Sequence, residues 1–436
     1  MSSETKRRRV VVIGLWHLGS VNAVGFCEKG YRVTGIETDP ARLSRLREGH
    51  PPLYEPGLEE ALGRHARSGS LQFEGSFEAV AEADWVVIAY DSPVNDRDEV
   101  DISPVARAAR GAAPHLRHDT PILVTSQVPL GTCERLDAVV HEINPSWRSG
   151  IVYVPENLKL GQAIARFLEP DMLVLGSANP QHAQAALELY QPFSTEKLTM
   201  DLKSAEMVKH ALNTFLATSI TFINEIANLS ARLGADAVAV GQALRLDKRI
   251  GRAALLTPGL GFSGGTLARD VRQLKTFADE LGQKAPLLDA IFAVNEGTFD
   301  QVVAILQRRL GTLVGRTIGL LGLTYKAGTS TVRRSPALKV IERLTQAGAV
   351  SAAYDPQADP DELREAAISV RRVGSVVELA AQADALVLLT EWPEFRDVGG
   401  DVAQAMARPL LVDTKNYLDP AKVKAAGFEY EGFGRS

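Results

Sequence analysis

A lysine and an asparagine lie four residues apart in a stretch with helical periodicity, where both side chains could act on one substrate. They are Lys209 and Asn213, within Ser204–Leu233, which contains no glycine or proline. Because positions i and i+4 share one helix face, an ammonium and an amide would project together and could stabilise an alkoxide as hydride leaves. The pattern alone favours a simpler interpretation, a surface pairing of Glu206 with Lys209.

A second group of residues could bind a dinucleotide. The predicted strand Val10–Ile13 runs into Gly14–Gly19 and then into a helix, as in turns whose free N–H groups bind a pyrophosphate. Glu37 follows the next predicted strand, where a carboxylate could accept hydrogen bonds from ribose hydroxyls. An acid there repels a 2′-phosphate and favours NAD over NADP, a preference that Arg42 weakens slightly.

The middle glycine of this turn is replaced by Trp16. That glycine normally lets the backbone approach the pyrophosphate. An indole would obstruct the cofactor or require a shifted pose. The motif alone is therefore evenly balanced between a cofactor turn and a doubly wound domain whose first turn binds nothing.

Two further segments carry polar groups to places where ligands gather. Glu156 follows the predicted strand Ile151–Val154, at the carboxyl edge of a parallel sheet. The alternative is a solvated carboxylate at a strand end. Gly259–Gly265 is rich in glycine, so its N–H groups are open to close approach by a sugar nucleotide, although the segment could equally be a flexible connection.

An alternation of strands and helices must position these residues. Short apolar runs in the first third indicate buried parallel strands. They are Val10–Ile13, Arg32–Ile36, Trp85–Ala89, Ile122–Ser126 and Ile151–Val154. A second alternation opens at Thr317, so the fold class is α/β, with two doubly wound Rossmann-like domains joined by a central helical region with one long helix. We expect domains at 1–200, 201–312 and 313–436.

Composition excludes several classes of protein. The 436 residues carry a net charge of −5, which argues against a nucleic-acid-binding surface. No apolar run approaches the ~20 residues of a membrane span, and no apolar signal segment precedes the first strand. We therefore expect a cytoplasmic protein with neither a nucleic-acid nor a membrane partner. The two cysteines exclude a disulfide framework, and the eight histidines show no metal-ligand spacing.

Short motifs occur in a fixed order from about Val10 to Gly434. They are Tyr54–Glu59, Pro155–Leu158, Asn224–Ala227, Arg249–Gly251, Gly322–Lys326, Arg333–Pro336 and Thr390–Trp392. Together they resemble the UDP-glucose/GDP-mannose dehydrogenase family. The resemblance implies an NAD-binding N-terminal domain, a central dimerisation region and a nucleotide-binding C-terminal domain. It also implies oxidation of the primary alcohol of a nucleotide sugar to a carboxylate in two NAD-dependent hydride transfers, by a homodimer or a higher homo-oligomer.

The resemblance also implies roles for individual residues. Lys209 and Asn213 match the catalytic lysine and asparagine, and Glu156 matches the acid–base glutamate. Asp270 matches an aspartate that helps a water act with the lysine. The residues implied for the cofactor are Gly14, Trp16, Leu18, Gly19, Glu37, Arg42, Ser92 and Arg333. Those implied for the nucleotide sugar are Leu158, Arg249 (from the neighbouring subunit), Gly261, Phe262, Gly265 and Lys326.

The largest departure from the family lies at the catalytic nucleophile, where Thr266 stands in place of a cysteine. A thiolate would capture the aldehyde as a thiohemiacetal, whereas a threonine hydroxyl stays protonated unless a base lies against it. Lys209 could be that base, or water could hydrate the aldehyde so that the gem-diol donates the second hydride. Cys27 and Cys133 are most simply small buried hydrophobes.

Smaller departures accompany this one. They are Gln127 and Ser92 for threonines, Leu160 for a glutamate, Arg269 for a lysine and Lys415 for an arginine. Together with Trp16 and Thr266, they indicate a site that is retuned or decaying.

Three functions are compatible with these residues. The first is an NAD-dependent nucleotide-sugar oxidoreductase whose chemistry needs no covalent thiol, stopping at an aldehyde or ketone or inverting a centre. The second is a full 6-dehydrogenase that makes a UDP-uronic acid through a hydrated aldehyde. The third is a catalytically inactive nucleotide-sugar-binding partner protein. Retention of Glu156, Lys209, Asn213, Asp270 and Glu37 together favours the first, whereas Trp16 and Thr266 favour the third.

Overall fold

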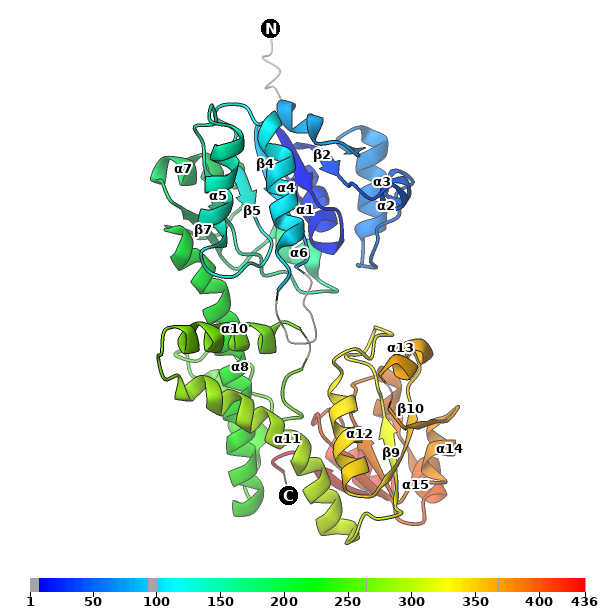
Figure 1. The fold of residues 1–436 in the computed structure, drawn as a ribbon. Coiled ribbons are helices and arrows are strands. Elements are labelled where there is room, and N and C mark those ends of the chain that lie inside the picture. Colours follow the sequence, from blue (N-terminus) through cyan, green and yellow to red (C-terminus); the bar gives the residue numbers. More distant parts are fainter. Residues whose placement is uncertain (1–7, 93–99, 264, 367, 436) are drawn as a thin grey trace. The chain divides into compact units, whose positions relative to one another are not determined.

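The computed structural model describes residues 8–92, 100–263, 265–366 and 368–435. These residues form two compact units, Met1–Ala211 and Leu212–Ser436. The long helix α8, Leu202–Leu233, begins in the first unit and continues into the second (Figure 1).

The first unit is built on an eight-stranded sheet in the order β3-β2-β1-β4-β5-β6-β7-β8. Its strands are β1 Arg9–Ile13, β2 Arg32–Ile36, β3 Leu71–Glu74, β4 Trp85–Ile88, β5 Ile122–Val124, β6 Ile151–Tyr153, β7 Leu173–Ser177 and β8 Lys197–Met200. All neighbouring pairs are parallel except β6 with β7. The order from β3 to β6 is that of a dinucleotide-binding doubly wound sheet.

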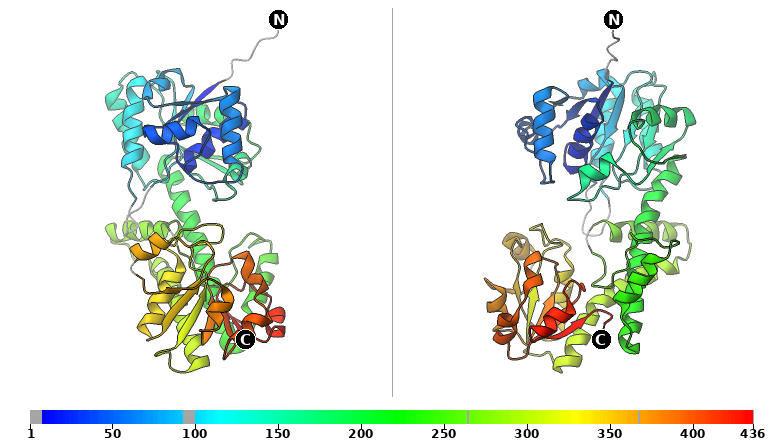
Figure 2. Two further views of the ribbon diagram at one scale, coloured as in Figure 1. Left: turned by 90° about the vertical axis from the view of Figure 1, so that its right-hand side faces the viewer. Right: turned by 180° about the vertical axis from the view of Figure 1, so that it is seen from behind.

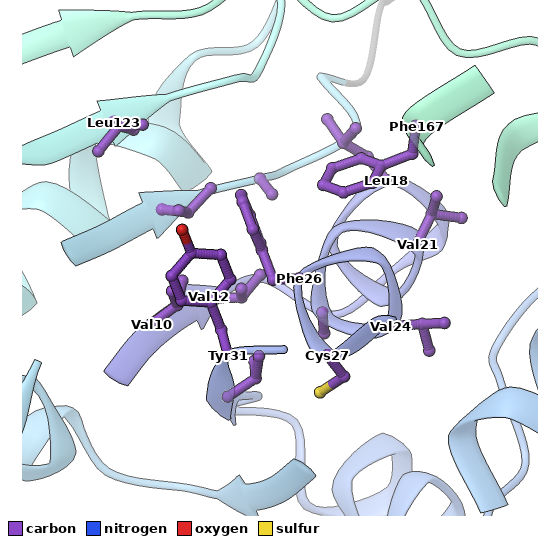
Figure 3. Close-up of a cluster of buried hydrophobic side chains, with 14 of the residues drawn as sticks. Val10, Val12, Leu18, Val21, Val24, Phe26, Cys27, Tyr31, Leu123 and Phe167 are labelled. Atoms are coloured by element: carbon purple, nitrogen blue, oxygen red, sulfur yellow. The ribbon is translucent and has the colours of Figure 1, made fainter. Parts of the chain in front are cut away.

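Helices cover both faces of this sheet because every central strand is apolar on both sides. The helices are α1 His17–Glu28, α2 Pro40–Arg47, α3 Leu58–Ser68, α4 Ser103–Ala112, α5 Thr132–Ile143, α6 Ala163–Leu168 and α7 Pro180–Leu189, with the short 3₁₀ turns η1 Phe77–Glu82 and η2 Ala113–His115. Val10 and Val12 face α1 and pack near Phe26 (Figure 3). Val11 and Ile13 face the opposite core, which contains residues of α4 and α5.

The second unit begins with packed helices. They are the remainder of α8, α9 Ala237–Leu246, α10 Leu267–Glu280 and α11 Pro286–Leu310. Ala217 of α8, Val271 of α10 and Ile291 of α11 share a small apolar core with Phe262.

A six-stranded sheet completes the second unit, in the order β11-β10-β9-β12-β13-β14 with every pair parallel. Its strands are β9 Thr317–Leu321, β10 Val350–Tyr354, β11 Arg371–Arg372, β12 Ala385–Leu388, β13 Leu410–Asp413 and β14 Glu429–Gly432. The remaining elements are α12 Pro336–Gln346, α13 Pro360–Glu365, α14 Val376–Ala380, η3 Pro393–Asp397, α15 Gly400–Ala405 and α16 Pro420–Ala425. Residues of α12 line one face of the sheet, and residues of α14 and α15 line the other.

Both sheets keep this helix–sheet–helix layering when each unit is viewed from other sides (Figure 2). The structure therefore confirms the predicted α/β class with two Rossmann-like sheets and one long helix. The three domain boundaries at 1–200, 201–312 and 313–436 stay a prediction.

Candidate active site

The predicted nucleotide turn lies between β1 and α1, and two of its glycines are required by space. Gly14 has φ +90, and a Cβ on it would lie 2.8 Å from the ring of Tyr90. A Cβ on Gly19 would lie 1.7 Å from the carbonyl oxygen of Gly14. The turn is therefore as tight as a dinucleotide turn must be, and its first and third positions fit NAD.

The indole of Trp16 is directed toward Arg42, whose guanidinium carbon lies 5.1 Å from the ring centroid. Arg42 Nη1 in turn lies 3.0 Å from Oε2 of Glu37, a carboxylate only 3% exposed. The backbone N–H of Asp39 donates to the other oxygen of Glu37. Glu37 is therefore fixed at the carboxyl end of β2, and Trp16 packs over the arginine that holds it.

An acid that the sequence analysis missed lies directly on the turn. Asp91 follows β4, and its Oδ2 accepts a hydrogen bond of 2.9 Å from the backbone N–H of Leu18. Leu18 is the second residue of α1. The signal was available, because an acid just after the strand that pairs with β1 must lie at the edge where the turn lies.

A buried histidine–carboxylate contact supports the same turn. His17 Nε2 lies 3.0 Å from Oε2 of Glu55, and both residues are buried. The Glu55 carboxylate also accepts hydrogen bonds from the N–H groups of Gly161 and Ala163. Burial raises the pKa of Glu55, but these N–H donors and His17 outweigh it and hold the pKa below its usual value. The Glu55 motif thus joins the start of α1 to the start of α6.

Glu156 lies beyond β6, as expected, next to the lysine of α8. Lys209 Nζ donates to the backbone carbonyl of Glu156 at 2.5 Å and to Oδ1 of Asn157 at 3.0 Å. Glu156 Oε1 is buried, and it has no hydrogen-bond partner among the residues that the structure describes. Burial raises the pKa of Glu156 to about 7, the positive charge of Lys209 opposes the rise, and the negative charge of Asp91 adds to it. A carboxyl with this pKa can exchange a proton at neutral pH.

Two loops at the same sheet edge are tied together by hydroxyls. The hydroxyl of Ser92, after β4, donates to the backbone carbonyl of Gln127 at 2.6 Å. The hydroxyl of Ser126 accepts from the N–H of Tyr90 at 2.8 Å. Leu158, which follows Glu156, packs against the core beneath α1.

In the second unit, Asn213 lies one turn beyond Lys209 on α8 and reaches α10. Its Nδ2 donates to Oδ2 of Asp270 at 2.5 Å, and both side chains are buried. Arg269 Nη2 lies 3.9 Å from the same carboxylate oxygen. Asp270 therefore remains an acceptor held in the first turn of a helix, where a negative charge is stabilised.

Thr266 lies at the N-cap of α10, and its side chain makes no capping hydrogen bond to that helix. It is exposed, and its backbone carbonyl accepts from the N–H of Asp270. The hydroxyl is therefore placed at the start of the helix that carries the buried Asp270.

The glycine-rich segment is held in place by side-chain amides. Asn295 Oδ1 accepts from the N–H of Phe262 at 2.8 Å, and its Nδ2 donates back to the Phe262 carbonyl at 3.0 Å. A Cβ on Gly261, which has φ +76, would lie 2.4 Å from that Oδ1. Asn224 Oδ1 accepts from the N–H of Gly259. Gly259, Gly261 and Phe262 are therefore anchored, and Gly265 follows them just before the start of α10.

The remaining candidates are cationic and belong to the second unit. Arg333 is exposed and lies within 3.4 Å of Glu362 and 3.3 Å of Glu365. Arg249 is exposed and pairs with Asp247 at 2.7 Å. Lys326 lies in the loop after β9. The start of this loop is fixed because the Asp355 carboxylate accepts hydrogen bonds from the N–H groups of Leu323 and Thr324.

The described residues lack two further features, a metal centre and a membrane-spanning helix. They contain no group of three His, Cys, Asp or Glu side chains that could hold a metal ion. Among their helices, none combines the length and the apolar character needed to cross a membrane.

Three domain descriptions of one family match the chain in order. Residues 8–194 match the NAD binding domain, residues 203–297 the central domain and residues 319–420 the UDP binding domain of the UDP-glucose/GDP-mannose dehydrogenase family.

Similar proteins cover the whole length. The chain is 33% identical over 429 residues to UDP-glucose 6-dehydrogenase YwqF of Bacillus subtilis, covering 98% of this chain and 97% of that one. It is 35% identical over 447 residues to a UDP-glucose 6-dehydrogenase of Pseudomonas aeruginosa, with 98% and 97% covered. A solved UDP-glucose dehydrogenase of Pyrobaculum islandicum is 35% identical with a TM-score of 0.87, and 100% of each chain is covered.

Proposed function

The chain belongs to the UDP-glucose/GDP-mannose dehydrogenase family, and from that premise we propose that it oxidises the C6 alcohol of UDP-glucose without forming a covalent thiohemiacetal. Family membership makes it an NAD-dependent nucleotide-sugar dehydrogenase. UDP-glucose is our choice of substrate because full-length relatives with 33% and 35% identity are named for it.

The observation that carries the proposal is the buried carboxyl of Glu156, next to the Lys209 ammonium that donates to the backbone carbonyl of the same residue. The Glu156 carboxyl has an unpartnered buried oxygen and a pKa near 7, and the Lys209 ammonium lies against the same segment. We assign Glu156 the role of accepting the proton of the C6 alcohol, directly or through water. We assign Lys209 and Asn213 the stabilisation of the alkoxide oxygen. A purely structural carboxylate would be expected to have hydrogen bonds on both oxygens.

The first oxidation balances with these residues. NAD, when bound, would supply the two-electron acceptor for the hydride of the alcohol carbon, and Glu156 would accept the proton of the hydroxyl. The products are the aldehyde, NADH and one proton. Gly14 and Gly19 would hold the pyrophosphate side of the cofactor, and Glu37 would accept hydrogen bonds from a ribose.

The second oxidation must proceed differently from one that uses a thiol. We propose that water adds to the aldehyde to give a gem-diol, and we assign its activation to Lys209 and Asp270, which match the lysine and the aspartate of the family. A second NAD, bound after the first NADH has left, would supply the acceptor for the remaining hydride of that carbon. Glu156, after releasing its first proton, would accept the proton of the gem-diol, which leaves the carboxylic acid. Thr266 would take no covalent part, because a hydroxyl at ordinary pKa is a poor nucleophile.

The experiment is a count of NADH released per UDP-glucose consumed, followed in pre-steady state. We expect a first NADH that is fast and a second that is slower because hydration of the aldehyde precedes it. Absence of any NADH across a panel of nucleotide sugars would favour the alternative of an inactive binding partner. A single NADH with aldehyde accumulating would favour an enzyme that stops after one oxidation.

A Thr266→Cys variant tests the missing thiol directly. Restoring a thiol should accelerate the second NADH by about tenfold or more, while Thr266→Ser should leave it unchanged. If the wild type already releases both NADH as fast as Thr266→Cys, or if mass spectrometry traps a sugar adduct on Thr266, the proposed lack of a covalent step is wrong.

A further inference from the structure

The carboxylate of Asp91 accepts a hydrogen bond from a backbone N–H group that could otherwise bind a dinucleotide, that of Leu18. In turns of this kind the pyrophosphate is bound by free N–H groups in the first turn of the helix that follows. The N–H of Leu18, the second residue of α1, instead donates to Asp91 Oδ2 at 2.9 Å. No acidic residue of α1 itself lies in that turn.

The backbone around Asp91 fixes this arrangement. β4 pairs in parallel with β1, and the N–H of Ala89 donates to the carbonyl of Ile13 at the point where β1 ends. Tyr90 then packs its ring against Gly14, so closely that a Cβ there would lie 2.8 Å from the ring. The next residue is Asp91. The strand register therefore delivers its carboxylate onto the nucleotide turn, and the contact does not depend on one flexible rotamer alone.

Trp16 does not explain the departure of this turn from a typical one. Its indole stacks on Arg42, on the side of Glu37, where a ribose is expected. The Asp91 carboxylate, in contrast, lies on the donor expected for the pyrophosphate. Two anions cannot share one N–H at close range without strong repulsion, and a positive helix N-terminus is the feature for which they compete.

We propose that Asp91 competes with the pyrophosphate of NAD for the first turn of α1, and that its carboxylate must leave the Leu18 N–H when NAD binds. Asp91 as a residue is exposed, although its carboxyl is part-buried where it meets the turn. Burial raises the pKa of this carboxyl, and the hydrogen bond from the Leu18 N–H opposes the rise. The residue thus sets the affinity for NAD below what the turn alone would give. This inference rests on NAD as the cofactor and goes beyond the assignment of UDP-glucose.

The test is Asp91→Asn, measured by calorimetric titration with NAD and with adenosine. The amide keeps an oxygen that can accept from Leu18 but removes the charge. We expect the Kd for NAD to fall by about tenfold at low ionic strength, and the gain to shrink as salt is added. Adenosine lacks a pyrophosphate and should bind the variant and the wild type equally.

The matched control is Asp419→Asn. Asp419 is also an exposed acid that accepts N–H groups in the first turn of a helix, those of Ala421 and Lys422 in α16. Its variant should leave the Kd for NAD unchanged. An unchanged Kd in Asp91→Asn would overturn the proposal. A weaker affinity would overturn it as well, because Asp91 would then be a hydrogen-bond acceptor for the cofactor.

The outcome does not depend on turnover. If the protein oxidises UDP-glucose but Asp91→Asn does not bind NAD more tightly, only the proposed competition between Asp91 and the pyrophosphate is wrong. If the protein does not oxidise UDP-glucose but Asp91→Asn binds NAD more tightly, only the assignment of UDP-glucose as the substrate is wrong. Thermal melting of both variants shows whether each remains folded.

Discussion

At the scale of single residues, Glu156 makes the sharpest prediction. Burial raises its pKa to about 7, so the carboxyl holds its proton at mildly acid pH. If Glu156 accepts the proton of the alcohol, kcat/KM must rise about tenfold per pH unit below that pKa and level off above it. Initial rates with UDP-glucose from about pH 5 to about pH 9 measure the limb. A flat or falling profile through neutral pH would contradict the assignment.

The matched variant Glu156→Gln removes the titration. It should lower kcat/KM by about 10²-fold or more and abolish the limb near pH 7.

The pH dependence of the free energy of unfolding gives an independent check of the raised pKa of Glu156. A carboxyl with a raised pKa in the folded state contributes stability that is complete below its unfolded pKa and is lost as pH rises through the folded pKa. The free energy of unfolding of the wild type should therefore fall more between pH 4.5 and about 7 than that of Glu156→Gln.

Residue types and spacing indicated the polar side chains of the site, but not how they are joined. The interpretation that Glu206 pairs with Lys209 was based on sequence spacing, which reveals only contacts between neighbours on the same helix face. In the structure, Lys209 instead donates to the Glu156 segment, 53 residues away in the sequence. The position of Asp91 just after β4 indicated the sheet edge where the nucleotide turn lies, but not its hydrogen bond to the N–H of Leu18 on another element. Contacts across elements depend on strand order, which no local pattern contains.

At the scale of elements, Glu206 shows how α8 is attached to the first sheet. α5 begins after Gly131, which has no side chain to cap the helix. The carboxylate of Glu206, on α8, caps α5 instead. Its two oxygens accept hydrogen bonds from the N–H groups of Gly131 at 2.5 Å and Cys133 at 2.9 Å. Burial raises the pKa of Glu206, and these N–H donors oppose the rise. The carboxylate therefore caps one helix and positions the helix that carries Lys209.

Removing that cap should destabilise the first unit. Glu206→Ala would leave two buried N–H groups without acceptors, at a cost of about 2–3 kcal/mol. We expect Tm of the first unfolding transition to fall by about 5–10 °C in calorimetry. Lys203→Ala, which breaks only the exposed pair with Glu134, is the control and should shift Tm by less than about 2 °C. Equal shifts in both variants would mean that Glu206 does not anchor α8.

Element prediction succeeded where burial left a simple pattern. The central strands β1, β2 and β9 are apolar on both faces, and α3 is bounded by Gly57 and Gly69, both left-handed. The sequence analysis named no strand at β3, β7, β8, β11 or β14, although β7 is fully buried. The hydrophobic pattern of β8 is too weak to detect because no residue of this strand is buried, and β11 is only two exposed residues long. Their pairing with neighbours, not their composition, makes them strands.

At the scale of the whole molecule, we predict a homodimer that buries an apolar stripe of α8. Phe215, Phe222 and Leu229 recur every seven residues and are 68%, 47% and 54% exposed, so they lie along one face of the helix. Light scattering of the wild type should give twice the 47.1 kDa chain mass. Phe222→Asp would place a charge in the interface and should give monomers, whereas Leu281→Asp, at a site 82% exposed outside the stripe, should not. A wild type that is monomeric at micromolar concentration, or a Phe222→Asp variant that stays dimeric, would show that this face of α8 is not the contact.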